Sequence, residues 1–313
     1  MLEPEIAAFV ARANAFYPDN TASLPTVEQR AIYERFAAAF TPAVPTGVVV
    51  QNATLVTAVG HSIRLRLYAK DEGAQSPGTL LYFHGGGFVF GSLDSHDIVT
   101  ARLAADTGLC VVAVDYRLAP EHPAPAAHED CLDVTLAALD GRLPFGSLPA
   151  PLLLVGDSAG ANLAASVAMR LRDSGIEGVA GVALIYPMLG AEPQSPARET
   201  EANAPMLTLA GVRMYSRLYW GDAPPPVWTV PIQARRFDGL PPVLSIGVEH
   251  DPLRDDARVF AERIHAAGGE AQLWIAPGLV HGCWRALETS PGVQRMHDEV
   301  CRFLLGSAGR RAR

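Results

Sequence analysis

A serine between two glycines is the feature of this sequence with the clearest chemical potential. Ser158 stands two residues after Gly156 and two residues before Gly160. An apolar run precedes the motif at residues 152–155, and a pattern of helical period follows it at 161–169. A chain that passes from strand to helix with almost no loop strains its central residue, and flanking glycines remove the clashes. The spacing predicts an exposed serine nucleophile; the alternative is a plain glycine-rich turn.

We expect the acid that supports this nucleophile to follow a later strand. Serine is a weak nucleophile at neutral pH and needs a base whose tautomer is fixed by an acid. The apolar run at 243–248 leads into several carboxylates. We prefer Asp251, because Glu249 still lies at the strand end, whereas Asp255 and Asp256 are typical of the cap and first turn of the next helix.

We expect the base to follow the last strand, at residues 271–275. His281 follows this strand in a glycine-flanked loop, which could turn the imidazole back over the sheet. His250 directly precedes the preferred acid, and we interpret it as a packing residue. His84 borders a glycine cluster, which we expect it to brace. The order serine, acid, histidine is the one that α/β-hydrolases use.

A second glycine cluster, His84-Gly85-Gly86-Gly87-Phe88, follows the predicted strand at 79–83. Consecutive glycines expose backbone N–H groups and allow close approach of a ligand. The spacing does not fit a dinucleotide fingerprint, because Phe90 stands where the last glycine should be, and the sequence has no phosphate-binding loop of the Walker type. We therefore predict an oxyanion hole formed by the N–H groups of Gly85, Gly86 and Ala159, rather than a flexible loop.

Composition excludes several classes of function. Of 313 residues, 49% are hydrophobic and 19% charged, which is typical of a globular protein, and the net charge of −8 disfavours nucleic acid and anionic membranes as partners. No run approaches the roughly 18 apolar residues of a membrane span, and residues 1–5 do not resemble a secretory signal. The four cysteines form no metal-binding pattern, and His122 and His128 do not share a helical face. We expect a cytoplasmic protein with reduced thiols and without metal or organic cofactor.

Hydrophobic periodicity predicts alternating strands and helices, and hence an α/β fold with one mostly parallel, eight-stranded sheet and helices on both faces. The expected strands lie at 48–56, 63–68, 79–83, 109–114, 152–155, 182–186, 243–248 and 271–275. The predicted organisation is N-terminal cap helices at 1–45, a catalytic domain at 46–190 and 236–313, and a cap insertion at 191–235. We expect the substrate to contact Phe88, Tyr186, Met206, Leu207 and Tyr215.

Four separated motifs together resemble the hormone-sensitive-lipase family of bacterial type IV carboxylesterases, from about residue 45 to 305. They are His84-Gly85-Gly86-Gly87, Gly156-Asp157-Ser158-Ala159-Gly160, Asp251-Pro252-Leu253 and His281-Gly282, with Asp115-Tyr116-Arg117-Leu118-Ala119-Pro120-Glu121 between the first two. The resemblance implies an α/β-hydrolase fold with a helical cap, hydrolysis of short- to medium-chain esters, and a possible homodimer. Ala161 and Cys283 depart from the family pattern, which more often has glycine and phenylalanine there.

The resulting hypothesis is acyl transfer from a small-molecule ester to water. Ser158 would attack the carbonyl, His281 would accept its proton, and Asp251 would orient the imidazole. The same three groups could also serve an amidase, a lactonase or a deacetylase. A non-catalytic receptor on this fold is disfavoured by the complete set of three residues.

Overall fold

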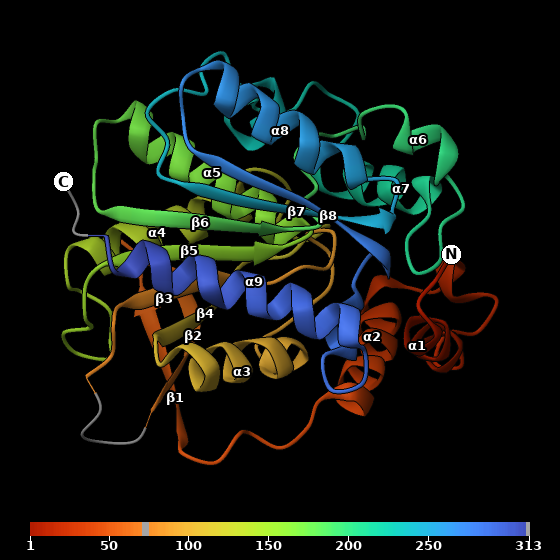
Figure 1. Ribbon diagram of the computed structural model, residues 1–313, viewed down its shortest axis with the longest axis horizontal. Helices are drawn as coiled ribbons and strands as arrows, with labels where there is room; N and C mark the ends of the chain where they lie inside the picture. Colours follow the sequence, from red (N-terminus) through yellow and green to blue (C-terminus); the bar gives the residue numbers. More distant parts are fainter. Residues whose placement is uncertain (71–74, 311–313) are drawn as a thin grey trace.

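The computed structural model, which describes residues 1–70 and 75–310, is built around one twisted sheet of eight strands in the order β1-β2-β4-β3-β5-β6-β7-β8 (Figure 1). Strand β2 runs antiparallel to both β1 and β4, and the other neighbours are parallel. The prediction of a mostly parallel eight-stranded sheet is confirmed. The strands are β1 (Val48–Val56), β2 (Ser62–Lys70), β3 (Thr79–Phe83), β4 (Cys110–Asp115), β5 (Leu152–Asp157), β6 (Val179–Ile185), β7 (Val243–His250) and β8 (Ala271–Val280).

Helices cover both faces of this sheet. Helices α3 and α9 pack on one face, and α4, α5 and α8 pack on the other (Figure 1). Because strands β3 and β5 are buried from both sides, every residue in them is buried, and their sequences are continuous apolar runs rather than alternating ones. The α-helices are α1 (Pro4–Asn14), α2 (Thr26–Phe40), α3 (Asp97–Thr107), α4 (Ala126–Leu139), α5 (Ala159–Asp173), α6 (Ala197–Thr200), α7 (Leu209–Trp220), α8 (Arg254–Ala266) and α9 (Pro291–Ala308).

The last strand is longer than the sequence pattern predicts. Strand β8 continues through Pro277 and Gly278 to Val280, where the prediction ends it at residue 275. Its extension pairs with β7, after a register irregularity, through His250 and Val280. Gly278 adopts a φ of +70°, a conformation that glycine tolerates without strain, and the strand bends there instead of ending. The next residue, His281, is therefore carried by the sheet itself rather than by a free loop.

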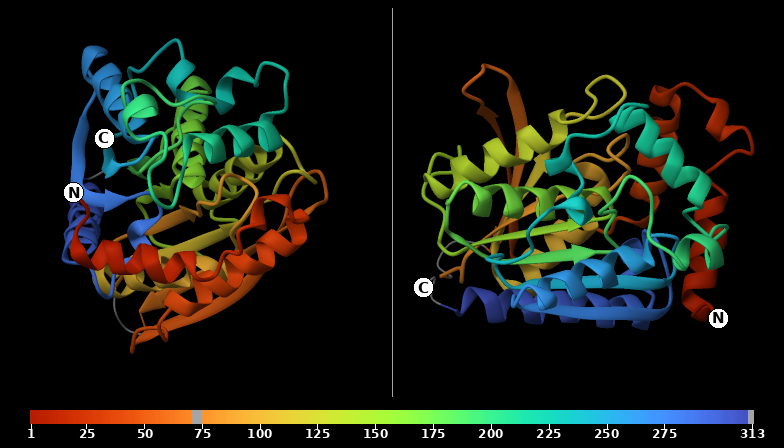
Figure 2. Two further views of the ribbon diagram at one scale, coloured as in Figure 1. Left: turned by 90° about the vertical axis from the view of Figure 1, so that its right-hand side faces the viewer. Right: turned by 90° about the horizontal axis from the view of Figure 1, so that it is seen from above.

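The N-terminal helices and the segment after β6 lie at the same end of the molecule. Helices α1 and α2 pass beside α6 and α7 beyond the carboxyl ends of the parallel strands (Figure 2). Residues 71–74 and 311–313, which belong to the predicted catalytic domain, lie outside the described residues. Within the described ranges, no helix has both the length and the apolar content needed to cross a membrane.

Candidate active site

Ser158 occupies a sharp turn between β5 and α5. Its backbone is strained, with φ 54° and ψ −117°, and its N–H donates to the carbonyl of Ile185 at 2.8 Å. A Cβ atom on Gly156 would lie 2.2 Å from the backbone carbon of Gly160, and one on Gly160 would lie 1.9 Å from the carbonyl oxygen of Phe83. Only glycine fits at both positions, so the sequence spacing follows directly from the geometry of the turn.

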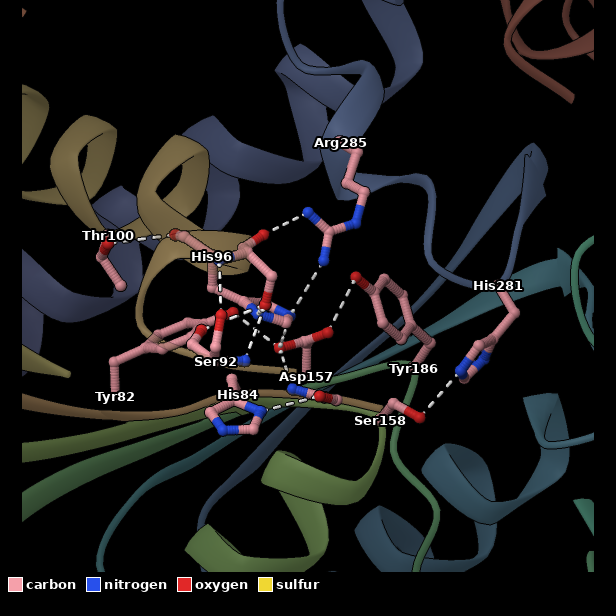
Figure 3. Close-up of polar contacts among 12 residues, drawn as sticks. Tyr82, His84, Ser92, His96, Thr100, Asp157, Ser158, Tyr186, His281 and Arg285 are labelled. Carbon is pink, nitrogen blue, oxygen red and sulfur yellow. Dashed lines mark hydrogen bonds and ion pairs between the residues drawn. The ribbon is translucent and has the colours of Figure 1, made fainter. Parts of the chain in front are cut away.

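A chain of hydrogen bonds joins the three residues predicted as nucleophile, base and acid. The imidazole Nε2 of His281 lies 2.8 Å from Ser158 Oγ, and its Nδ1 lies 2.7 Å from Asp251 Oδ2. Asp251 is fully buried, and its other oxygen accepts the N–H of Leu253 at 2.8 Å. A carboxylate at Nδ1 holds the proton on that nitrogen, so that Nε2 is free to accept a hydrogen bond from the serine hydroxyl. Figure 3 shows the imidazole pointing toward the serine hydroxyl.

The competing acids and histidines have other partners. Glu249 turns away and accepts the N–H of Gly278 at 2.6 Å, and His250 lies 3.3 Å from Glu201. His84 braces the glycine cluster, because its Nδ1 donates to the carbonyl of Gly85 at 2.8 Å. None of these groups lies in the hydrogen-bonded chain that contains Ser158.

Asp255 and Asp256 lie in the first turn of α8, as predicted, but they do not cap that helix. Asp255 accepts the N–H of Ala197 at 2.7 Å. Asp256 accepts the N–H groups of Leu189 at 2.9 Å and Gln194 at 3.1 Å. Both carboxylates therefore fasten the segment that follows β6 to the start of α8.

The glycine cluster differs from the prediction in one donor. The N–H of Gly85 donates to Asp157 Oδ1 at 2.9 Å, so the prediction that Gly85 serves the oxyanion is wrong. Gly86 and Gly87 line the cavity in front of Ser158. Within the described part of the chain, the N–H groups of Gly86, Gly87 and Ala159 have no hydrogen-bond acceptor. The free donors thus begin one residue later than predicted.

A buried carboxylate behind the nucleophile organises this end of the sheet. Asp157 accepts the hydroxyl of Tyr82 at 2.6 Å and that of Tyr186 at 3.4 Å, and His96 lies 3.7 Å away (Figure 3). Burial alone would raise the pKa of Asp157, but His96 and the Tyr82 hydroxyl outweigh burial and hold this pKa well below its usual range. No role of Asp157 is predicted from the sequence, although it stands directly before Ser158.

A cavity of about 430 Å³ opens in front of Ser158 and His281. Four of the five residues predicted to contact substrate line this cavity, namely Tyr186, Met206, Leu207 and Tyr215. Phe88 does not. Its ring is fully buried and stacks on Tyr219 with 4.0 Å between the ring centroids, because a φ of +64° turns the side chain away from the cavity. The prediction for Phe88 is therefore wrong.

The other residues that line the cavity come from the N-terminal helices, from the segment after β6 and from the chain after His281. Helix α2, in the predicted N-terminal cap, contributes Tyr33 and Phe36. The 3-10 helix η5 (Cys283–Ala286) contributes Arg285, which is not among the residues predicted from the sequence. Its position four residues after the predicted base was the available signal.

A family model described as the alpha/beta hydrolase fold matches residues 80–285. This chain belongs to that family. Esterase LipI of Mycobacterium tuberculosis is 39% identical over 212 residues, which cover 67% of this chain and 66% of the relative. The ethyl acetate hydrolase of Pseudomonas putida is 30% identical over 294 residues, which cover 91% of this chain and 92% of the relative.

Solved structures agree with this assignment. The hyperthermophilic esterase from the archaeon Pyrobaculum calidifontis superposes with a TM-score of 0.85 at 30% identity and covers 99% of both chains. The matches to the mycobacterial relatives LipI and NlhH span slightly less than two thirds of those proteins, at 66% and 65% of their lengths. The predicted resemblance to the hormone-sensitive-lipase group of esterases is confirmed by these relatives.

Proposed function

We propose that this chain hydrolyses carboxylic esters with Ser158 as nucleophile, His281 as base and Asp251 as the acid that orients the base. The observation that carries the proposal is the unbroken hydrogen-bond chain from Ser158 Oγ through His281 to the buried Asp251. The strained turn that presents the serine to a cavity adds support, since strain of this kind is typical of a nucleophile elbow.

The reaction follows from the placement of these groups. Ser158 Oγ attacks the ester carbonyl while His281 Nε2 accepts the hydroxyl proton, which His281 then gives to the leaving alcohol. The resulting acyl-enzyme is attacked by a water that His281 deprotonates, and the acid is released with Ser158 restored. Asp251 stabilises the imidazolium formed at both stages.

The N–H groups of Gly86, Gly87 and Ala159 are the proposed donors to the oxyanion. All three lack another acceptor among the described residues, and two line the cavity with Ser158. Each oxyanion donor typically contributes about 10²–10³ in rate. The Gly87 N–H is included because the Gly85 N–H is occupied by Asp157.

We further propose that the preferred substrates are esters of short to medium acyl chains. A cavity of about 430 Å³ bounded by Met206, Leu207 and Tyr215 suits a small apolar group better than a long fatty chain. The name of the Pseudomonas putida relative, ethyl acetate hydrolase, is consistent with small esters.

Hydrolysis of 4-nitrophenyl esters from acetyl to palmitoyl tests this proposal, with Ser158→Ala as the control. We expect kcat/KM to be highest for short and medium chains. In Ser158→Ala, activity should fall by about 10⁶, to the background rate of this assay. Equal rates for the two proteins on every ester would refute ester hydrolysis at Ser158. A maximum at palmitoyl would refute the chain-length preference alone.

A further inference from the structure

The side chain of Arg285 is a buried cation in the wall of the substrate cavity. It is 7% exposed, and it reaches from η5 toward His96 and Asp157 (Figure 3). Arginine is rarely buried to this degree without an anionic partner, because desolvating its charge is costly. The polar groups around this guanidinium therefore indicate which kind of ligand it can bind.

No direct polar partner of Arg285 is an anion. The guanidinium donates to the carbonyl of Ser95 and to the hydroxyl of Tyr33 at 2.8 Å, and it lies 3.4 Å from His96 Nε2. Burial lowers the pKa of His96, which favours its neutral form. Among the described residues, no carboxylate lies within 4.0 Å of the guanidinium.

Asp157 acts on Arg285 only from a distance. His96 stands between the two groups, with its Nε2 3.7 Å from Asp157 Oδ1. The oxygens of Asp157 already accept the hydroxyls of Tyr82 and Tyr186 and the N–H of Gly85. Burial alone would lower the pKa of Arg285, but Tyr33 and Asp157 raise it, so the guanidinium stays protonated.

The guanidinium also has donors to spare. It carries five N–H groups, of which the partners above engage no more than three. The rings of Tyr33 and Phe36 lie 5.3 and 5.6 Å from its carbon and fix its plane against α2. A planar, pre-positioned guanidinium with free donors matches a carboxylate, which it can bind through two parallel hydrogen bonds.

We infer that Arg285 binds a free carboxylate on the substrate, so that the preferred ester is anionic, with its carboxylate held at η5 while its ester group lies at Ser158. This inference rests on the proposed ester hydrolysis and adds a substrate class to it. Arg285 takes no part in bond breaking and acts as a specificity-determining residue. Such a charge-assisted pair is expected to change kcat/KM by about 10- to 100-fold, mainly through KM.

Two matched pairs of esters test the inference. Monoethyl adipate and ethyl hexanoate differ by a carboxylate on the acyl side, and 4-acetoxybenzoate and 4-methylphenyl acetate differ by one on the alcohol side. We expect the ratio of kcat/KM for the anionic over the neutral member to fall about 10- to 100-fold in Arg285→Met in at least one pair. For Arg285→Lys, which keeps the charge but loses the planar guanidinium, we expect a ratio between those of the wild type and Arg285→Met.

The exposed Arg302 of α9 provides the control, since Arg302→Met removes one positive charge far from η5 and should leave both ratios unchanged. Binding of adipate to the inactive Ser158→Ala protein, measured by calorimetry with and without Arg285→Met, gives a readout that needs no turnover. Ratios that stay the same in Arg285→Met, or adipate binding that does not depend on Arg285, would overturn the inference. If the wild type hydrolysed none of these esters, the neutral ones included, the proposed function itself would be refuted.

Discussion

His128 joins three helices through a hydrogen-bond network that needs its neutral form. Its Nδ1 lies 2.6 Å from the hydroxyl of Tyr219 on α7, and its Nε2 lies 2.9 Å from Asn162 Oδ1 on α5. The amide nitrogen of Asn162 donates to the carbonyl of Met188 at 2.8 Å, so its oxygen is free to accept from His128. Tyr219 is then the donor to Nδ1, and burial lowers the pKa of His128 to about 4.

This lowered pKa makes the free energy of unfolding depend on pH. Between about pH 6.5 and pH 4, His128 takes up a proton in the unfolded chain but not in the folded protein. Acidification through this window therefore favours unfolding, and above pH 6.5 the contribution is constant. At 1.36 kcal/mol per pKa unit, a drop from pH 7.5 to pH 4.5 removes about 2.5 kcal/mol through this one group.

Replacing His128 by glutamine isolates the effect. At pH 7.5 we expect His128→Gln to be less stable than the wild type by about 1–3 kcal/mol, because the hydrogen bonds to Tyr219 and Asn162 are imperfectly replaced. At pH 4.5 the variant has not lost the 2.5 kcal/mol that the wild type has, so the two stabilities should converge or cross.

Urea unfolding at pH 7.5, 6.0 and 4.5 measures this difference. His122→Gln, which removes an exposed histidine from the loop before α4, is the matched control. A difference between wild type and His128→Gln that is the same at all three pH values would refute the assignment of a neutral, buried imidazole at this position.

Further variants test the site and its turn. Asp251→Asn is expected to lower kcat by about 10⁴ on a 4-nitrophenyl ester through the wrong tautomer of the base, whereas Glu249→Gln should change it little; a reversed result would reassign the acid. Gly160→Ala places a Cβ 1.9 Å from the carbonyl oxygen of Phe83 and should destabilise the fold by several kcal/mol or prevent folding. Gly306→Ala, in open space on α9, should instead raise stability by about 0.5–1 kcal/mol in the same thermal unfolding assay, and equal effects of both changes would contradict the steric argument.

The fold and the three central residues of the site could be predicted because short sequence patterns determine them. Ser158, Asp251 and His281 each follow a recognisable apolar strand, and parallel strands end at one edge of a sheet. Residues distant in sequence were therefore expected to meet without any knowledge of side-chain positions. The homodimer that the family resemblance implies depends on surface residues, and it stays a prediction.

The two errors among the predicted site residues concern orientation rather than position. Gly85 and Phe88 both lie in the glycine cluster, as predicted, but the direction of an N–H group or a ring depends on neighbours that are distant in sequence. Asp157 takes the Gly85 N–H, and Tyr219 provides the face against which Phe88 stacks. A run of three glycines leaves each backbone dihedral open, so contacts with other parts of the chain select the conformation.

The segment from Asp251 to Asp256 joins the chemistry of the site to the placement of its cover. Asp251 holds His281, while the buried Asp256 and Asp255 hold backbone N–H groups at Leu189, Gln194 and Ala197, the chain that leads to the cavity-lining Met206 and Leu207. Burial raises the pKa of Asp256 to about 7 against the opposing effect of those N–H groups. The N–H groups that contact Asp256 favour its ionised carboxylate, whereas its burial favours the neutral acid. Because one short segment carries all three acids, the wall of the cavity and the orientation of the His281 imidazole depend on the same few residues, and a change in this segment should alter substrate fit and the proposed proton transfer together.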